Sequence, residues 1–370
     1  MKIVHVITGL KTGGAEQILY TICHADKKNS HCIISLTSRG EYAAKLEKVG
    51  VEVLCLNLQY KINIFTGIFE LARYIKHVKP DIVQTWMFHS DLIGGIIAKY
   101  FGVKKIFWSE HAANIKLLSF TVRIIVKICS ILSYIIPNAV VCCAFSTKTI
   151  LIKEGYSKDK MAVINNGCDM SYYIDKGNKI NRKSISSSLN MTDVLIGVVA
   201  RWDIYKDIPN LLQALKILIS KNDAIKCILV GDQLNLQNII LCKLLDQYEL
   251  RDNVIMLGLR NDIPDILRTI DLFVLSSVSE AFPNVLVESM ACGSPCVATD
   301  VGDVKYIIGK TGWIVPPSNH EALANSISLS VVEMKNSAAW VQRKKYCRDR
   351  IINNFSLDKM VTNYMDLWNK

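Results

Sequence analysis

Short apolar runs alternate with segments of helical periodicity along most of the chain. Runs of this kind lie at residues 2–8, 32–36, 51–56, 81–85, 106–108, 139–143, 161–164, 194–200, 224–231, 253–257, 272–275 and 296–299. A short apolar run bounded by turn residues predicts a buried strand, and apolar residues three and four apart predict a helix. Repeated strand and helix units with short connections predict α/β architecture with doubly wound parallel sheets.

The length of 370 residues exceeds one ordinary core and predicts two domains. Residues 176–190 are rich in serine, asparagine and lysine, which is typical of a linker. We therefore predict a first domain at 1–175, a linker at 176–193 and a second domain at 194–350. A final helix is expected within 351–370.

The region from Ile115 to Ala144 raises the question of a membrane span, because no residue from Ile128 to Phe145 is charged. Pro137 and Asn138 interrupt it, which divides it into a helix at 120–136 and a buried strand at 139–143. The helical part carries Lys116, Arg123 and Lys127 beside many isoleucines. It can lie on an anionic membrane surface or pack on the sheet.

The net charge of +11 is concentrated in the first half, where residues 1–170 hold 21 basic and 12 acidic side chains. A basic half attracts nucleic acid, an anionic membrane or a phosphorylated substrate. Nucleic acid is the weakest of these, because no helix-turn-helix, zinc or RNA-recognition signature is present. The twelve cysteines form no C-x-x-C pair, and residues 2–7 are too short for a signal peptide, so we expect a reduced, cytoplasmic protein.

The stretch 272–293, LFVLSSVSEAFPNVLVESMACG, predicts a strand, a loop and a helix. Asn284 is a candidate N-cap, so the backbone amides of Val285 and Leu286 would face a ligand beyond the strand, which favours an anion. Glu280 in the loop and Glu288 in the helix can accept hydrogen bonds from ligand hydroxyl groups. The stretch therefore suits a ligand with both phosphate and hydroxyl groups.

Two cations follow the strand at 194–200, namely Arg201 and Lys206. Asp207 as N-cap and Pro209 in the first turn predict that a helix begins directly afterwards. The two cations are therefore expected to lie between the carboxyl end of a strand and the amino end of a helix.

The loop after the first strand, GLKTGGAE, brings Gly13 and Gly14 to the start of a helix, a geometry suited to a phosphate. Its spacing matches neither the dinucleotide fingerprint nor the P-loop. WMFHSD follows the strand at 81–85, so His89 and Asp91 are either cleft residues or a satisfied histidine and a capping aspartate.

These motifs resemble those of the retaining glycosyltransferases of family 4. The resemblance rests on E-x7-E within SEAFPNVLVESMACGSPCVATDVG, on R-x4-K at 201–206, on the GGAE loop, and on NNGCD and GWIVPP, which are similar to P-N-G-V-D and G-x-L-V-P. It implies the GT-B fold, in which two Rossmann-like domains face a central cleft and the terminal helix crosses back onto the first domain.

The resemblance also implies roles for single residues. Glu280 would contact the donor sugar, Glu288 the ribose, and Arg201 with Lys206 the diphosphate. The remaining implied contacts are Gly13 and Gly14 near the donor phosphates, Asn284, Val285 and Leu286 at the donor, Arg260 at the base, and His111, after the strand at 106–108, near the donor sugar and acceptor. Asp262 is expected to cap the next helix.

We therefore expect retaining transfer from a nucleotide diphosphate sugar, with UDP favoured, to a hydroxyl of a saccharide, as in lipid-linked cell-surface oligosaccharides. No D-x-D motif is present, so neither a metal nor another cofactor is expected. The enzyme would be cytoplasmic, with peripheral contact to the inner membrane as a further hypothesis. The alternatives are a GT-B nucleotide-sugar 2-epimerase and a non-catalytic nucleotide-sugar-binding scaffold.

Overall fold

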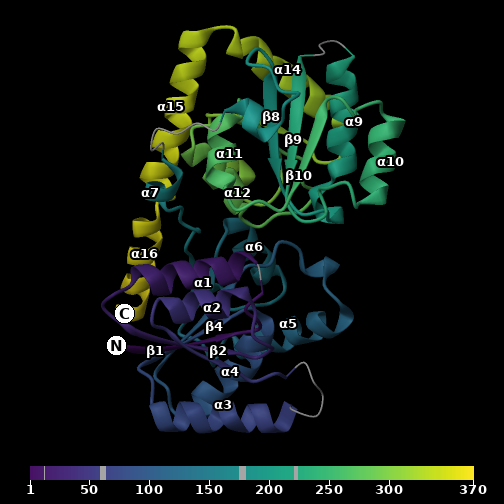
Figure 1. Ribbon diagram of the computed structural model, residues 1–370. Coiled ribbons are helices and arrows are strands. Elements are labelled where there is room, and N and C mark those ends of the chain that lie inside the picture. Colours follow the sequence, from purple (N-terminus) through teal and green to yellow (C-terminus); the bar gives the residue numbers. More distant parts are fainter. Residues whose placement is uncertain (12, 59–63, 175–180, 221–223) are drawn as a thin grey trace. The chain divides into compact units, whose positions relative to one another are not determined.

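The computed structural model describes residues 1–11, 13–58, 64–174, 181–220 and 224–370. It divides the chain into two compact units (Figure 1). Unit 1 comprises Met1–Gly167 and Leu357–Lys370, and unit 2 comprises Cys168–Ser356. Thr12 of the glycine-rich loop and residues 176–180 of the predicted linker lie outside the described residues.

Unit 1 is built on a parallel sheet of seven strands in the order β3-β2-β1-β4-β5-β6-β7. The strands are β1 (Lys2–Ile7), β2 (Ser30–Ser35), β3 (Glu52–Cys55), β4 (Ile82–Trp86), β5 (Lys105–Glu110), β6 (Ala139–Cys142) and β7 (Met161–Val163). The strand order reverses between β1 and β4, and ligands of such sheets bind outside the strands' carboxyl ends at this point.

Helices cover both faces of this sheet. One apolar cluster contains residues of α1 (Gly14–Ala25), α2 (Glu41–Lys48) and α16 (Leu357–Asn369). The other contains residues of α3 (Ile64–Val78), α4 (Phe88–Tyr100), α5 (Phe120–Leu132) and α6 (Phe145–Lys153). Because both faces are covered, the strands are nearly continuous apolar runs, which is why they were readable in the sequence.

The last helix, α16, belongs to unit 1 although unit 2 precedes it in the chain. Its buried residues Met360, Val361, Tyr364 and Trp368 recur at helical spacing and join the cluster with α1 and α2. The chain changes units after Gly167 and again after Ser356. These two points are neighbours, because the amide of Cys168 donates to the Phe355 carbonyl at 2.9 Å.

Unit 2 is built on a parallel sheet of six strands in the order β10-β9-β8-β11-β12-β13. The strands are β8 (Val194–Val199), β9 (Ile225–Val230), β10 (Val254–Gly258), β11 (Leu272–Leu275), β12 (Cys296–Thr299) and β13 (Trp313–Val315). The helices are α7 (Met170–Tyr173), α8 (Arg182–Ile185), α9 (Ile208–Ile219), α10 (Ile239–Gln247), α11 (Ile263–Thr269), α12 (Asn284–Ala291), α13 (Val304–Ile308), α14 (His320–Met334) and α15 (Ser337–Asn354). The order reverses between β8 and β11.

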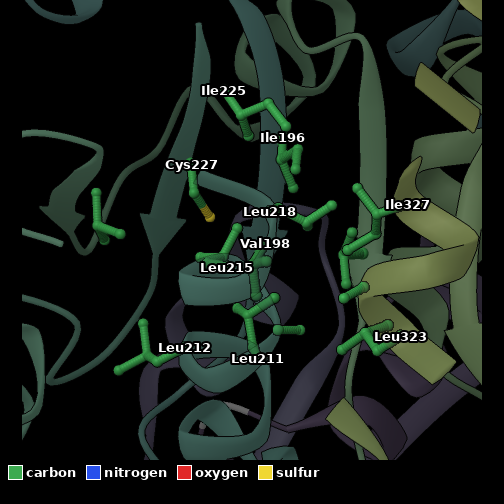
Figure 2. Packing of buried hydrophobic residues seen from close by; sticks show 14 of the residues in the cluster. Ile196, Val198, Leu211, Leu212, Leu215, Leu218, Ile225, Cys227, Leu323 and Ile327 are labelled. Carbon is green, nitrogen blue, oxygen red and sulfur yellow. The ribbon is translucent and has the colours of Figure 1, made fainter. Parts of the chain in front are cut away.

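The core of unit 2 lies between this sheet and α9 and α14. Figure 2 shows leucines of α9, among them Leu211 and Leu215, beside Ile196 and Val198 of β8, with Ile327 of α14 on the other side of the group. All five side chains are buried. This packing fixes the position of β8 and α9, and therefore of the loop between them, which carries Arg201 and Lys206.

The described second part of the predicted linker packs on unit 2. Arg182 of α8 donates to the Asp193 carbonyl at 2.6 Å and pairs with the Asp271 carboxylate at 2.7 Å. Leu189 is fully buried. The polar composition of this stretch gave no sign that Arg182 and Leu189 attach it to unit 2. In the sequence, an arginine that pairs with a distant aspartate cannot be told from a solvated one.

The helix that raised the question of a membrane span ends at Leu132, and β6 begins at Ala139. Within the described ranges, no helix has both the length and the apolar character that a bilayer crossing requires.

Candidate functional site

The loop after β8 is held at the carboxyl end of the unit 2 sheet by a close backbone contact. Gly231 follows β9 with a φ of 138°, and a Cβ atom there would lie 1.8 Å from the Ala200 carbonyl oxygen. The Trp202 amide donates to the Asp232 carbonyl at 2.8 Å. Only glycine permits this approach, so Gly231 places the loop that carries the two predicted cations.

Arg201 stands at the start of this loop with a side chain that is 62% exposed. Its Nε donates to Asp203 Oδ2 at 2.9 Å, and the other carboxylate oxygen of Asp203 accepts from the Tyr205 amide at 2.9 Å. Asp203 therefore caps the short 3-10 helix at 204–206 and orients the guanidinium. The remaining guanidinium donors can meet a phosphate without moving the backbone.

Lys206 and Glu280 form a direct ion pair, with 2.5 Å between Nζ and Oε1. Both side chains are mostly buried, at 21% and 13% exposure. Ser277 also donates to Glu280 Oε1, at 2.7 Å, and Ser276 donates to the Lys206 carbonyl at 2.8 Å. The loops after β8 and β11, the two strands at the reversal point, are thus joined at two predicted site residues.

Gly302 fixes the other side of the Glu280 loop. Its φ is 53°, and a Cβ atom there would lie 2.1 Å from the Glu280 carbonyl oxygen. The amide of Asp303 donates to the Ala281 carbonyl at 3.0 Å. The loop after β12 therefore supports the backbone of Glu280 directly, through a position that tolerates no side chain.

The helix after this loop, α12, begins one residue earlier than predicted. Pro283 occupies the N-cap position and Asn284 is the first helical residue, so the prediction of Asn284 as N-cap is wrong. Proline has no amide to satisfy and its φ is restricted, which suits it to the extended cap position. The Leu286 amide donates to the Pro283 carbonyl at 3.1 Å, so it already has a partner inside the first turn. Val285 is partly exposed there, while the Leu286 side chain is fully buried.

Glu288 lies about one turn into α12 and is partly buried. It forms a side-chain hydrogen bond with Tyr173, the last residue of α7. Burial and the Glu288 charge raise the pKa of Tyr173, so the hydroxyl keeps its proton and donates to the carboxylate. Tyr173 was not predicted as a site residue. It orients the carboxylate that the resemblance assigns to the ribose.

Arg260 and Asp262, after β10, bind each other through two hydrogen bonds of 2.8 and 2.6 Å. This bidentate contact raises the pKa of Arg260 and lowers that of Asp262. Asp262 stands at the N-cap position of α11, but its side chain makes no cap hydrogen bond there. The prediction that Asp262 caps this helix with its side chain is therefore wrong, because the nearby guanidinium competes for the carboxylate.

The prediction that the Asp207 side chain caps α9 is wrong as well. Asp207 stands at the N-cap position, but its side chain accepts from Ser318 at 3.2 Å and does not cap the helix.

In unit 1 the glycine-rich loop begins α1 directly after β1. Gly13 is the N-cap residue in an extended conformation, and Gly14 is the first helical residue. A Cβ atom at Gly13 would lie 2.3 Å from a carboxylate oxygen of Glu16, so Glu16 folds back over the N-terminus of its own helix. Burial raises the pKa of Glu16. A carboxylate therefore occupies the position at which the sequence predicted a phosphate.

His111 follows β5 and is partly buried. Its ring stacks on Trp86 with 5.7 Å between centroids, and its Nε2 lies 3.4 Å from Ser109 Oγ. Burial lowers the pKa of His111 to about 4, so the imidazole is neutral at pH 7. It can exchange hydrogen bonds with a neutral hydroxyl but cannot supply a positive charge.

Two carboxyl groups in the core of unit 1 are fully enclosed. Asp91 in the first turn of α4 and Glu110 at the end of β5 are 0% and 1% exposed, and they hydrogen-bond to each other. Thr85 also donates to Asp91. Burial raises the pKa of Asp91 to about 7 and that of Glu110 well above its usual range, so the pair holds a shared proton. Asp91 is thus a core residue and not the cleft residue that was one of the two alternatives from the sequence. His89 is partly buried, and burial lowers its pKa.

A chain of hydrogen bonds anchors Trp86. Its Nε1 donates to His5 Nδ1 at 3.2 Å, His5 Nε2 lies 2.9 Å from His31 Nδ1, and His31 Nε2 lies 3.1 Å from Asp26 Oδ2. An indole N–H can only donate, so His5 carries its proton on Nε2 and donates to His31, which donates to Asp26.

Among the described residues, one group of three could offer ligands to a metal ion, and two of its members belong to this chain of hydrogen bonds. The group is His5, Cys23 and His31, whose ligand atoms lie within 4.8 Å of one another. A metal ion on His5 Nε2 would require a proton on Nδ1, which would then face the Trp86 N–H. Two donors would oppose each other. The residues therefore fit a hydrogen-bonded chain and do not fit a metal site.

The structure brings some of the predicted residues into contact and leaves others in separate pairs. Lys206 meets Glu280, whereas Arg201 and Arg260 each pair with an aspartate of their own loop. All of these loops follow the carboxyl ends of parallel strands in unit 2. Gly13, Gly14 and His111 belong to unit 1.

Two protein-family models match this chain. The model of the group 1 glycosyl transferases matches residues 179–345, and that of glycosyltransferase family 4 matches residues 12–172. An Escherichia coli UDP-Gal:alpha-D-GlcNAc-diphosphoundecaprenol alpha-1,3-galactosyltransferase is 26% identical over 86% of this chain and 82% of its own length. A Campylobacter jejuni N,N'-diacetylbacillosaminyl-diphospho-undecaprenol alpha-1,3-N-acetylgalactosaminyltransferase is 22% identical over 84% of each chain.

Among solved structures, the Anabaena protein HepE in complex with UDP superposes with a TM-score of 0.86. It is 20% identical and covers 99% of each chain, so this likeness concerns the fold. The two family models together match most of the sequence, and both sheets are the parallel Rossmann-like sheets that these transferases share. The chain therefore belongs to the family 4 glycosyltransferases with the GT-B fold.

Proposed function

We propose that this protein transfers a sugar, with retention of anomeric configuration, from a UDP-sugar to a hydroxyl group of a lipid-linked saccharide. The observation that carries the proposal is the Lys206–Glu280 pair, which joins the loops after β8 and β11 where the strand order of unit 2 reverses. The relatives from Escherichia coli and Campylobacter jejuni are named for saccharide acceptors on a diphosphate-linked polyprenol. HepE binds UDP on the same fold.

The donor diphosphate would lie against Lys206 and Arg201. Lys206 already compensates one carboxylate, and a bound diphosphate would add the charge that the exposed Arg201 guanidinium can neutralise. This compensation matters most when the bond between the sugar and the phosphate breaks, because negative charge then accumulates on the leaving group. Arg201 and Lys206 would supply it without a metal ion.

Glu280 would orient the donor sugar through its hydroxyl groups. Its Oε1 is occupied by Lys206 and Ser277, so the other oxygen is the one placed to accept from a ligand. A carboxylate restrained in this way is a weak nucleophile. We therefore assign Glu280 an orienting role. The acceptor oxygen bonds to the anomeric carbon on the face that the diphosphate leaves, and its proton passes to the leaving phosphate oxygen.

The remaining site residues would complete donor binding. Glu288, oriented by Tyr173, would accept hydrogen bonds from the ribose, and the first turn of α12 would face the phosphates with Asn284 and Val285, because the Leu286 amide already donates to Pro283. Arg260 would border the base. In unit 1, Gly13, Gly14 and the neutral His111 would border the donor and acceptor, with Glu16 leaving the helix N-terminus when phosphate binds.

The test is a transfer assay with purified protein, UDP-sugars and a polyprenol diphosphate saccharide, preceded by a thermal-shift panel of nucleotide diphosphates. A ligand that binds only the folded state raises the apparent stability according to its affinity. Transfer with retained configuration would support the proposal. Conversion of the nucleotide sugar without acceptor would instead indicate a 2-epimerase, and binding without turnover would indicate a scaffold.

We further propose that unit 1 contacts an anionic membrane through α5. Six exposed apolar side chains on and beside this helix are spaced three or four residues apart: Leu117, Phe120, Ile124, Ile128, Ile131 and Ile135. Exposed Lys116, Arg123 and Lys127 accompany them. Apolar side chains that enter the interface beside cations that meet lipid phosphates are typical of interfacial helices.

Such contact would hold the enzyme at the cytoplasmic face of the inner membrane, beside a lipid-linked acceptor. Sedimentation with vesicles of anionic lipid at low salt tests it, with vesicles of zwitterionic lipid as the control. Phe120→Ser should lower the bound fraction several-fold. Equal sedimentation with both lipids, or no binding at low salt, would contradict the membrane proposal.

A further inference from the structure

Tyr364 of α16 reaches His111 by two routes. The Tyr364 ring stacks on Trp86 with 6.1 Å between centroids, and Trp86 stacks on His111. The Tyr364 hydroxyl lies 3.3 Å from Ser109 Oγ, which lies 3.4 Å from His111 Nε2. The hydroxyl route ends on one particular nitrogen of the imidazole.

The direction of these hydrogen bonds follows from the acidity of the groups. A phenol is a stronger acid than an alcohol, and the free nitrogen of a neutral imidazole is the strongest acceptor of the three. Burial raises the pKa of Tyr364, so its hydroxyl keeps the proton, and burial lowers that of His111, so the imidazole stays neutral. The favoured order is therefore Tyr364 to Ser109 to His111 Nε2.

The surroundings keep these groups in place. Tyr364 and Ser109 are 2% and 1% exposed, so water does not compete for their hydroxyl groups. Trp86, between the two rings, is held by its hydrogen bond to His5. Trp368, one turn further along α16, donates to Gln84 at 3.1 Å and anchors the helix.

We propose that Tyr364 is a positioning residue for His111, which acts through Ser109 to hold the imidazole as the tautomer protonated on Nδ1. His111 then offers an N–H to a ligand oxygen. It does not offer a lone pair that could remove a proton from an acceptor hydroxyl. The meaning of this for sugar transfer rests on the proposed function, whereas the tautomer itself does not.

The experiment is ¹⁵N NMR of the full-length protein labelled at histidine, because protonated and unprotonated ring nitrogens resonate in separate regions. The His111→Asn spectrum assigns the His111 signals. Wild type is compared at pH 7 with Tyr364→Phe, which removes one hydroxyl, and with Ser109→Ala, which breaks the same route by a smaller change. Tyr20→Phe is the matched control, since Tyr20 lies on α1 and stacks on His24.

In the wild type and in Tyr20→Phe we expect a protonated Nδ1 and an unprotonated Nε2. In Tyr364→Phe and Ser109→Ala both signals should move toward the average of the two tautomers. A wild-type spectrum with the proton on Nε2, or an unchanged tautomer in either Tyr364→Phe or Ser109→Ala, would overturn the proposal. Where transfer is measurable, Tyr364→Phe should lower kcat several-fold at an unchanged donor KM. Absence of transfer in the wild type would count against the proposed function and leave the NMR result intact.

Discussion

The enclosed Asp91–Glu110 pair should make unit 1 less stable as the pH rises, and Asp91→Asn should reduce this dependence. Below about pH 4 Asp91 is protonated in both the folded and the unfolded chain. Between pH 4 and 7 the unfolded chain releases this proton while the folded chain keeps it, because burial raises the pKa of Asp91 from 3.8 to about 7. The contribution of Asp91 to the free energy of unfolding therefore falls by about 1.4 kcal/mol per pH unit in this window, and the buried Glu110 adds a fall of its own in wild type and variant alike.

The magnitude follows from the same shift. A rise of about 3 pKa units corresponds to about 4 kcal/mol above pH 7, of which about 3 kcal/mol accumulates between pH 5 and pH 7. In Asp91→Asn the side-chain oxygen can still accept from Thr85, and the amide can donate to Glu110. Relative to wild type, the variant should therefore gain about 3 kcal/mol of stability between pH 5 and pH 8.

The assay is urea unfolding at pH 5 and pH 8 followed by hydrogen exchange of peptides that contain β5. This readout reports on unit 1 even when the two units unfold separately. Asp159→Asn, an exposed position in the same unit, is the control and should follow the wild type. If Asp91→Asn and wild type lose stability in parallel between pH 5 and pH 8, the shared proton is refuted.

Three further predictions concern unit 2. Lys206→Ala should lower the rate of transfer from a UDP-sugar by a factor of about 100 or more. Lys243→Ala, at an exposed position, is the control and should not lower it. Equal rates in the two variants would show that Lys206 is not a site residue. EDTA should leave this transfer rate unchanged. A loss of activity that Mg²⁺ or Mn²⁺ restores would show that Arg201 and Lys206 do not take the place of a metal ion. Gly302→Ala should destabilise unit 2 by about 3 kcal/mol or more, because a positive φ and a contact with the Glu280 carbonyl combine. Gly50→Ala in unit 1, with a positive φ but open space around it, should cost only about 1 kcal/mol, and equal losses in urea unfolding would contradict the contact.

Local chemistry was enough to predict the two parallel sheets and the positions of the loops that follow their strands. Buried parallel strands are nearly continuous apolar runs, so the strand positions and the doubly wound architecture could be read directly. Lys206 and Glu280 were singled out in the sequence because they match the R-x4-K and E-x7-E motifs of the resemblance. Their ion pair was not readable, since it depends on β8 and β11 being neighbours, and 74 residues separate the two side chains.

Choices between competing partners lay beyond the sequence. Asp262 has the residue type and position of a helix cap, yet Arg260 takes its carboxylate, and Pro283 takes the cap position predicted for Asn284. Glu16 covers the helix start where a phosphate was expected. In each case two residues or groups near the helix start could take the same position. Which of them does so depends on the geometry of the folded loop.

The sequence by itself determined the two-sheet α/β architecture and the loops that carry the proposed donor-site residues, because these depend on contacts between near neighbours in the chain. Only the tertiary structure decided the long-range hydrogen bonds and the buried carboxyl pair of unit 1. Ser109 and Tyr364 are 255 residues apart, and Asp91 and Glu110 come from a helix and a strand whose packing encloses both carboxyl groups. Hydrogen bonds and pKa shifts of this kind arise from desolvation and distance, and both exist only once the chain has folded.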